Sequence, residues 1–371
     1  MAAGLEFNKS LEGTVGVELE LQLLDRESLD FADIAPQVLK ALRPRFGERI
    51  KEEFIKCMVE LNTRVCANVA EADADLRETT AALAKVLEGH GAVAYAASLH
   101  PWERGTGLNL SGNPRYERIL KDLQIVGRRF ITQGLHVHIG VGDAERAIRI
   151  NNHMRMYLPL LLALSTSSPF YTGEVTGLYS YRTKLFEALP MAGLPDMIEG
   201  WEEFKSMTAL LVSGGIIESV KDLWWDVRPH PGFGTVEVRI CDLPCKHRHT
   251  LALVALIQAL VASLGTTSMH PAARVQMQIL RSNKWQATRY GLDGVFVNPV
   301  SATRKPIREV VGDLLDFVRP ASEKLGTLGY LAGIEEILNE GTGAHRQREL
   351  YDTNGGDFHA VIQAMRAEFL S

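Results

Sequence analysis

The alternation of apolar and polar residues predicts strands in the first two thirds of the chain. Residues 235–242 read T-V-E-V-R-I-C-D, so the valines and the isoleucine face one way while Glu237, Arg239 and Cys241 face the other. Neighbouring side chains on one face of a strand lie about 7 Å apart. A carboxylate and a guanidinium at this spacing could hold a metal ion and a phosphate together, and an exposed ion pair is the alternative.

Three more runs, at residues 57–64, 14–24 and 134–141, alternate in the same way. An antiparallel sheet can bury one face and expose the other, so strands of one sheet would combine their polar residues on one open face. That face would carry Glu18, Glu20, Glu60, His136, His138, Glu237 and Arg239. Glu53 stands seven residues before Glu60. Solvated faces usually mix Lys, Thr and Ser with Glu, so this composition indicates a multi-metal site for a phosphorylated substrate.

The predicted elements favour an α+β fold. Strands are expected near residues 13–24, 54–64, 92–98, 134–142, 224–229 and 234–242. Helices are expected at residues 72–89, 115–131, 143–164 with a kink at Pro159, 249–267, 307–325, 334–339 and 358–369. Strands dominate the first two thirds and helices the last third, unlike a βαβ alternation. We expect one domain, residues 1–371, with a helical C-terminal part from about residue 249.

Composition indicates a soluble globular protein. Of 371 residues, 46% are apolar and 23% are charged. The net charge of -5 argues against a nucleic-acid surface, and the N-terminus lacks the apolar core of a secretory signal. Residues 250–268 approach the length of a membrane span, but Gln258 and Ser263 interrupt them, which favours a buried helix and no membrane contact. Four cysteines suit a reducing cytoplasm without a disulfide framework.

The chain lacks the glycine motifs that bind nucleotides. G-x-x-x-x-G-K-[ST] is absent, and Gly105, Gly107 and Gly112 do not form G-x-G-x-x-G. A nucleotide would therefore be held through divalent metal ions between its phosphates and carboxylates, with an arginine neutralising the transferred phosphoryl group.

Two other metal sites fit parts of the sequence. His136-x-His138 could be the paired ligand of an amidohydrolase-type enzyme, although such pairs normally stand early, on the first strand of a parallel barrel. A zinc site could be formed by Cys241, Cys245, His247 and His249. Their spacing matches no common zinc ribbon or finger.

Further candidates for substrate contacts lie outside these strand faces. In W-W-D-V-R-P, residues 224–229, Asp226 and Arg228 would share a face, and Arg228 could bind a substrate carboxylate. The alternative is an internal Asp226–Arg228 pair in an aromatic hairpin. Arg182, in Y-S-Y-R, is a similar candidate, and Arg289, in R-Y-G-L-D-G, could contact phosphate.

Six motifs occur in order over roughly residues 12–369: G-V-E-L-E, an acidic residue seven before the Glu of V-E-L-N-T, G-L-H-V-H-I-G, W-W-D-V-R-P, T-V-E-V-R-I-C-D and R-Y-G-L-D-G. Together they resemble the carboxylate–amine ligase family, the bacterial glutamate–cysteine ligase type 2 group. The resemblance implies a glutamine-synthetase-like fold, in which an antiparallel β-sheet curves into a funnel with flanking helices. ATP would enter one end of the funnel and the amino-acid substrates the other.

The resemblance also implies roles for individual residues, and a homodimer. Magnesium ions, or manganese, would be held by Glu18, Glu20, Glu53, Glu60, His136 and Glu237. Arg239 would face the transferred phosphate. Distant relatives have a polar residue at the position of His138, which is therefore kept only as a substrate or phosphate contact, together with Asp226, Arg182 and Arg289.

The predicted activity is ATP-dependent amide-bond formation between two small molecules. A carboxylate, expected to be the γ-carboxylate of glutamate, attacks the γ-phosphate of MgATP and forms an acyl phosphate, and the amino group of cysteine or another amine then displaces phosphate. Glu237, Arg239 and Arg228 are the expected catalytic residues. Two classes stay open beside it: a metal-dependent amide hydrolase that uses these ligands without ATP, and a catalytically quiet nucleotide- or metabolite-binding homologue.

Overall fold

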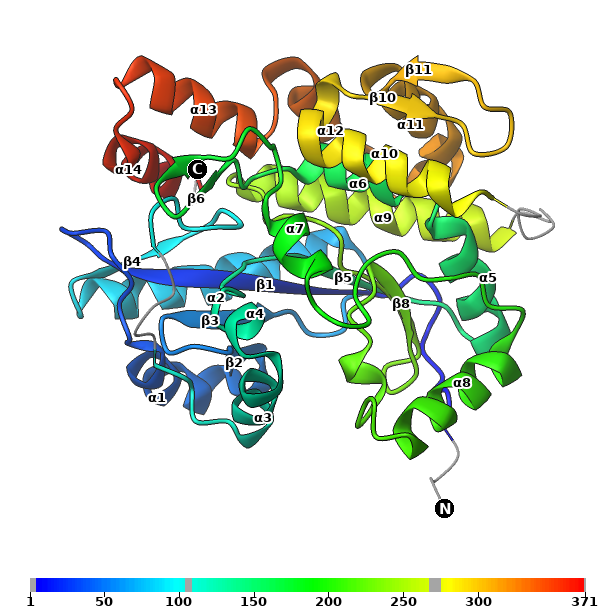
Figure 1. Ribbon diagram of the computed structural model, residues 1–371, viewed down its shortest axis with the longest axis horizontal. Helices are drawn as coiled ribbons and strands as arrows, with labels where there is room; N and C mark the ends of the chain where they lie inside the picture. Colours follow the sequence, from blue (N-terminus) through cyan, green and yellow to red (C-terminus); the bar gives the residue numbers. More distant parts are fainter. Residues whose placement is uncertain (1–4, 104–108, 267–274, 370–371) are drawn as a thin grey trace.

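The computed structural model describes residues 5–103, 109–266 and 275–369 (Figure 1). Gly105 and Gly107 of the glycine cluster, and the last residue of the helix predicted at 249–267, lie outside these ranges.

Seven strands form one antiparallel sheet, which confirms the predicted α+β fold of an antiparallel sheet with flanking helices. The strands follow the order β2 (Ile50–Glu52), β3 (Met58–Asn62), β1 (Val15–Asp25), β5 (Leu135–Gly140), β9 (Thr235–Val238) and β8 (Val227–His230), and β4 (Ala92–Tyr95) also pairs with β1. The register sets polar residues of neighbouring strands opposite one another: Glu20 with Glu60, Glu18 with His136, and His138 with Glu237. The funnel shape stays a prediction.

The end of β9 departs from the predicted alternation. The strand ends at Val238, and the backbone N–H groups of Arg239 and Ile240 both donate to the carbonyl of Asp226, over 2.9 and 3.1 Å. Two residues therefore face one on the neighbouring segment, as in a β-bulge. Because of this irregularity Cys241 is buried in the hydrophobic core and does not join the open face.

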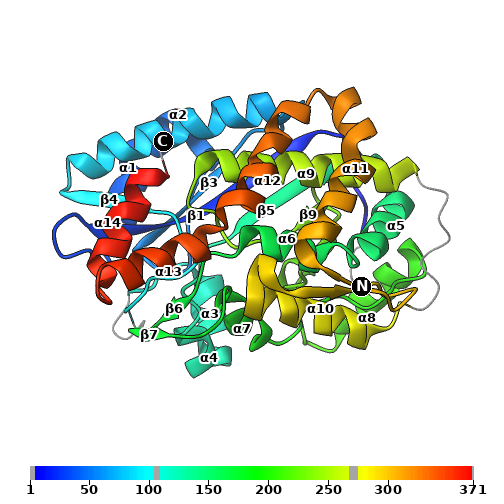
Figure 2. The same cartoon turned by 90° about the horizontal axis from the view of Figure 1, so that it is seen from above.

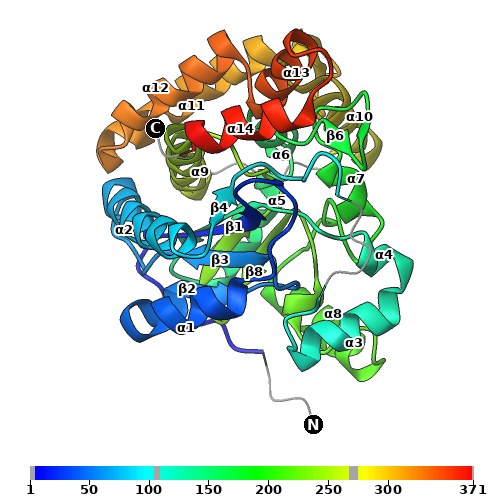
Figure 3. The same ribbon diagram turned by 90° about the vertical axis from the view of Figure 1, so that its left-hand side faces the viewer.

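The opposite face of the sheet forms the core. The alternate residues of β1 that point there are at most 1% exposed: Val15, Val17, Leu19, Leu21 and Leu23. Helices α2 (Val69–Glu88) and α9 (His247–Thr266) pack against this face, and α6 (Leu158–Ser165) adds further apolar side chains to the same core. Figures 1 and 3 show α9 on one side of the sheet and α3 (Pro114–Leu123) on the other. Helix α1 (Ala35–Phe46) packs against β2 and α2, and its buried side chains belong to the same core as those of α9.

Helix α9 confirms the predicted buried helix. Among the described residues it is the one helix long and apolar enough to cross a membrane, and 78% of its apolar window is buried inside the protein. Figure 2 shows α9 crossing the molecule beneath α12 (Leu328–Glu340). Its apolar residues are therefore used for packing within this fold.

Two predicted helices are each divided. Residues 115–131 form α3 and α4 (Ile125–Arg128), which are separated at Gln124, a residue with φ of 51°. Residues 143–164 form α5 (Ala144–Met154) and α6, so the prediction of one helix kinked at Pro159 was wrong. Pro159 stands in the first turn of α6, where its missing N–H would have no helical partner in any case.

The prediction missed several helices, some of them between the strands: α1, α7 (Arg182–Glu187), α8 (Trp201–Ser213), α10 (Met277–Tyr290) and α13 (Gly343–Thr353). The predicted α11 (Ile307–Leu325) and α14 (Phe358–Glu368) are present. Short elements complete the described chain: η1 (Gly47–Arg49), η2 (Val220–Asp222), η3 (Gly291–Asp293) and the pairs β6 (Phe170–Tyr171) with β7 (Glu174–Val175) and β10 (Val295–Val297) with β11 (Arg304–Pro306). The single catalytic domain with its helical C-terminal part stays a prediction.

Candidate active site

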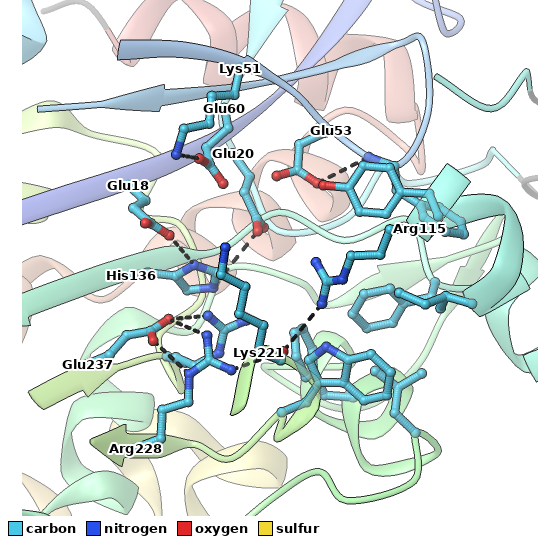
Figure 4. Close-up of a pocket in the computed structure, with 18 of the residues that line it drawn as sticks. Glu18, Glu20, Lys51, Glu53, Glu60, Arg115, His136, Lys221, Arg228 and Glu237 are labelled. Carbon is cyan, nitrogen blue, oxygen red and sulfur yellow. Dashed lines mark hydrogen bonds and ion pairs between the residues drawn. The ribbon is translucent and has the colours of Figure 1, made fainter. Parts of the chain in front are cut away.

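The open face of the sheet lines a cavity of about 290 Å³ (Figure 4). All seven polar residues predicted to share this face line it: Glu18, Glu20, Glu60, His136, His138, Glu237 and Arg239. Glu53 joins them from the segment after β2, where it stands with Glu20 and Glu60; its neighbour Glu52 lines the cavity as well. Glu52 also accepts a hydrogen bond from Asn113 over 3.2 Å.

Two groups of ligand atoms could each hold a cation. The first is Glu18, His138 and Glu237, and the second is Glu20, Glu53 and Glu60; within each group the ligand atoms lie within 4.8 Å of one another. In the first group His138 Nε2 lies 3.3 Å from Glu18 Oε1 and 3.9 Å from Glu237 Oε1. The histidine in this group is thus His138, whereas the resemblance had implied His136.

His136 lies between the two groups. Its Nδ1 is 3.1 Å from Glu18 Oε2, and its Nε2 is 3.8 Å from Glu20 Oε1. The Nε2 atom of His136 is buried and has no hydrogen-bond partner among the described residues. A buried nitrogen without a hydrogen-bond partner costs folding free energy. A cation held by the adjacent carboxylates would supply the missing partner.

The second group carries more negative charge than its surroundings neutralise. Burial, together with the charge of Glu60 and Glu18, raises the pKa of Glu20 to about 8. Burial and the neighbouring Glu20 and Glu60 raise the pKa of Glu53 well above its usual value. Carboxyls in this state suit a hard divalent cation, which would restore their charged form.

The first group behaves differently because cations already surround it. Burial opposes the charged form of Glu18, but hydrogen bonds from His136 and His138 outweigh it and lower the pKa of this carboxyl well below its usual value. Burial likewise opposes the charge of Glu237, and Arg228 and Arg239 outweigh it and lower its pKa. Glu18 and Glu237 are therefore ionised at neutral pH.

Arg228 and Arg239 hold Glu237 from two sides. Arg228 Nε donates to Glu237 Oε2 over 2.7 Å and its Nη2 to Oε1 over 3.3 Å, while Arg239 Nη1 forms a close ion pair with Oε1. Arg228 Nη1 donates to the carbonyls of Val220, Lys221 and Leu223. The Arg228 guanidinium is thus fully engaged within the protein, which leaves it without a free fork for the substrate carboxylate that the sequence suggested.

Asp226, predicted as a substrate contact, does not line the cavity, and it does not form the alternative pair with Arg228 either. Its carboxylate accepts from Lys284 Nζ over 2.6 Å, and Lys284 also lies 3.2 Å from Glu187. Since Lys284 comes from α10, an element that the sequence pattern did not reveal, its pairing with Asp226 could not be anticipated.

The two remaining arginine candidates lie outside the cavity lining. Arg182 is buried beneath it, where its guanidinium donates to the carbonyls of Arg239 and Ile240, each over 3.3 Å. It therefore supports the backbone that carries Arg239. Arg289 donates to the carbonyl of Gly177 and lies over the ring of Tyr290, 4.8 Å from its centroid.

Three of the four residues proposed for the alternative zinc site contact other side chains. His247 Nε2 lies 2.7 Å from Asp73, and His249 Nε2 lies 2.9 Å from Glu336. Cys245 is buried against Ser167, with Sγ and Oγ 3.0 Å apart. Within the described ranges these residues form no group of metal ligands.

Sequence reasoning missed the cationic residues that line the cavity from outside the predicted strands. Lys51, on β2, lies 3.4 Å from Glu60, and Arg115, on α3, forms an ion pair of 2.9 Å with Asp222 (Figure 4). Lys51 stands opposite Glu60 in the register, so recognition of β2 as a strand would have revealed it. No sequence signal places Arg115 here, because α3 reaches the site only through tertiary packing.

Solved structures define the class to which this fold belongs. A glutamate–cysteine ligase from Francisella tularensis in complex with AMP superposes with a TM-score of 0.72, at 13% identity, over 99% of this chain and 90% of that chain. A bifunctional glutathione synthetase from Pasteurella multocida superposes with a TM-score of 0.72, at 14% identity, over 96% of this chain and 52% of that one. At such low identity these matches show the fold, which is that of glutamate–cysteine ligases.

Sequence comparison then shows the family. The model of glutamate–cysteine ligase family 2 matches residues 14–367, and the chain belongs to this family. Two relatives with the provisional name glutamate–cysteine ligase 2 are each 36% identical: one from Solibacter usitatus, over 96% of this chain and 93% of its own length, and one from Gloeobacter violaceus, over 94% of both. The protein is therefore an ATP-dependent carbon–nitrogen ligase. Neither the amide hydrolase nor the quiet homologue finds support among these relatives.

Proposed function

We propose that the protein joins the γ-carboxylate of glutamate to the amino group of cysteine or another amine, by way of an acyl phosphate. The relatives' names supply the pair of glutamate and cysteine. The observation that carries the proposal is the adjacency of two ligand groups and Arg239 on one sheet face. Phosphoryl transfer from ATP needs this combination, because charge must be neutralised on both the phosphates and the attacking oxygen.

Each group would hold one magnesium or manganese ion. Glu20, Glu53 and Glu60 supply three carboxylates to one, and Glu18, His138 and Glu237 supply two carboxylates and an imidazole to the other. Bound there, the ions would supply positive charge that neutralises the phosphates of the nucleotide. His136, between the groups, would orient Glu18 through its Nδ1.

Arg239 is the cation best placed to face the transferred phosphoryl group. It lines the cavity, and only its Nη1 is engaged with Glu237, while its Nε has no partner. Arg228 also lines the cavity, but its guanidinium is bound to Glu237 and to backbone carbonyls, so it keeps that carboxylate charged and oriented. In this proposal Arg239 is a catalytic residue and Arg228 is a positioning residue.

The decisive experiment measures phosphate release from ATP and magnesium with purified protein, with glutamate alone and with glutamate plus an amine. Release that requires both substrates supports the ligase, and the best amine identifies the acceptor. Release of phosphate with neither acid nor amine, or hydrolysis of an amide without ATP, would contradict it.

A cytoplasmic location and a homodimer also belong to this proposal. The four cysteines are free and buried, as suits a reducing compartment. The homodimer follows from the family resemblance, and light scattering on the purified chain tests it: a monomeric mass would contradict it.

A further inference from the structure

The cavity has two chemically different ends. At one end Glu18, His138 and Glu237 lie with the two arginines that flank Glu237. Near the other group, Glu20, Glu53 and Glu60, the lining includes a set of apolar side chains beside Lys51 and Arg115. Figure 4 shows Arg115 of that second end across the cavity from Glu237.

Six side chains form the apolar wall of the second end: Ile119, Leu123, Phe130, Phe186, Leu189 and Trp224. Phe130 and Phe186 pack edge to face, with ring centroids 4.7 Å apart. The wall comes from α3, from α7 and from the segments that follow α4, α7 and η2, so it is assembled from several parts of the chain. Four of its members are only half-buried: Ile119, Leu123, Phe130 and Trp224.

Helix α3 presents its apolar side to the cavity. Tyr116, Ile119 and Leu123 are spaced by three and four residues, so they share one helix face, and all three line the cavity. No residue of α3 is fully buried. Core packing therefore buries the apolar face of α3 only in part, and a ligand in the cavity would cover the rest of it.

The wall lies next to the second group of carboxylates. Tyr116 packs on Phe54, the residue after Glu53, with ring centroids 5.5 Å apart. Arg239, the cation suited to phosphate, is paired with Glu237 of the first group, whereas Arg115 beside the wall is paired with Asp222. The phosphates of ATP would therefore lie beside Glu237 and Arg239, and the group that attacks the acyl phosphate would approach from the apolar wall.

We infer that the apolar wall receives the substituent of the amine acceptor, so that the enzyme also ligates primary amines bearing an aromatic or branched aliphatic group, and prefers them to small amines. The inference rests on the proposed function. In the reaction the amine nitrogen forms a bond with the acyl carbon, the bond from that carbon to the phosphate oxygen breaks, phosphate leaves, and the proton lost by the amine passes to solvent.

The test compares ethylamine, isobutylamine and phenethylamine as acceptors, with glutamate as donor, by phosphate release. Each added methylene or ring that enters an apolar site raises kcat/KM, so phenethylamine should exceed ethylamine by about 10- to 100-fold. Equal rates for the three amines would overturn the inference while leaving the ligase intact. Release with no amine at all would refute the proposed function, and the inference with it.

A matched pair of variants locates the effect. Ile119→Ala combined with Leu123→Ala should lower the ratio of phenethylamine to ethylamine by about tenfold and leave the KM for ATP unchanged. Neither side chain is fully buried, so folding is preserved. Ile125→Ala on the adjacent α4, whose side chain is 52% exposed and does not line the cavity, should leave the ratio unchanged. A raised KM for ATP with an unaltered ratio would show that the wall binds adenine, and would overturn the inference.

Discussion

Replacement of Arg228 by alanine should destabilise the protein strongly. The guanidinium is 5% exposed and binds both oxygens of Glu237, which is 1% exposed, so its removal leaves a buried carboxylate with fewer partners. The carbonyls of Val220, Lys221 and Leu223 lose their donor as well. Breaking a buried, hydrogen-bonded ion pair from one side costs about 3–5 kcal/mol.

The assay is urea denaturation, followed by circular dichroism, of the wild type and of two variants. Arg228→Ala should lower the free energy of unfolding by about 3–5 kcal/mol. Arg115→Ala is the matched control, because its ion pair with Asp222 is 37% exposed on the arginine side and should contribute under about 1 kcal/mol. If Arg228→Ala unfolded like the wild type but showed a raised KM for glutamate, Arg228 would bind the substrate carboxylate and the positioning role would be wrong.

Further predictions concern Glu237 and Arg239, the proton bound by Glu20, and the buried Asp242. Glu237→Gln and Arg239→Ala should each lower kcat by about two to three powers of ten, and near-wild-type turnover in both would contradict their roles. Because the pKa of Glu20 is raised to about 8, the metal-free protein binds a proton there that magnesium must displace. Calorimetry should therefore show tighter magnesium binding as pH rises through about 8, and a pH-independent affinity would contradict this. Glu20 also binds more protons folded than unfolded, so metal-free stability should fall as pH rises through the same range. Asp242→Ala should lower the free energy of unfolding by about 3–5 kcal/mol, since the buried Asp242 accepts from Ser167 N and Ser168 Oγ, each over 2.8 Å; an unchanged urea midpoint would refute this.

The sheet face could be predicted because alternation is a local property. The positions of Glu18, Glu20 and Glu60 relative to the apolar residues of their strands depend only on their neighbours in sequence, and the structure places all three on the cavity. The buried helix α9 was predictable for a similar reason, since a long apolar stretch interrupted by Gln258 suits a core helix.

The remainder depends on contacts between distant segments. Which histidine joins Glu18 and Glu237 is decided by the register of β1, β5 and β9, and that register places His138 opposite Glu237. Arg182 stands in a loop-rich sequence without periodicity, so its burial beneath Arg239 left no local signal. α1 did leave a signal, because its buried residues recur at helical spacing, but Pro36 and Pro44 obscured it.

The acyl phosphate is the central claim, and an isotope experiment tests it most directly. Glutamate whose γ-carboxylate carries the heavy oxygen isotope is incubated with the enzyme, MgATP and an accepted amine, and the released phosphate is analysed by mass spectrometry. Attack of the carboxylate on the γ-phosphorus predicts one labelled oxygen in each phosphate released. Unlabelled phosphate would contradict the account, and label in AMP would show that the carboxylate is activated at the α-phosphate instead.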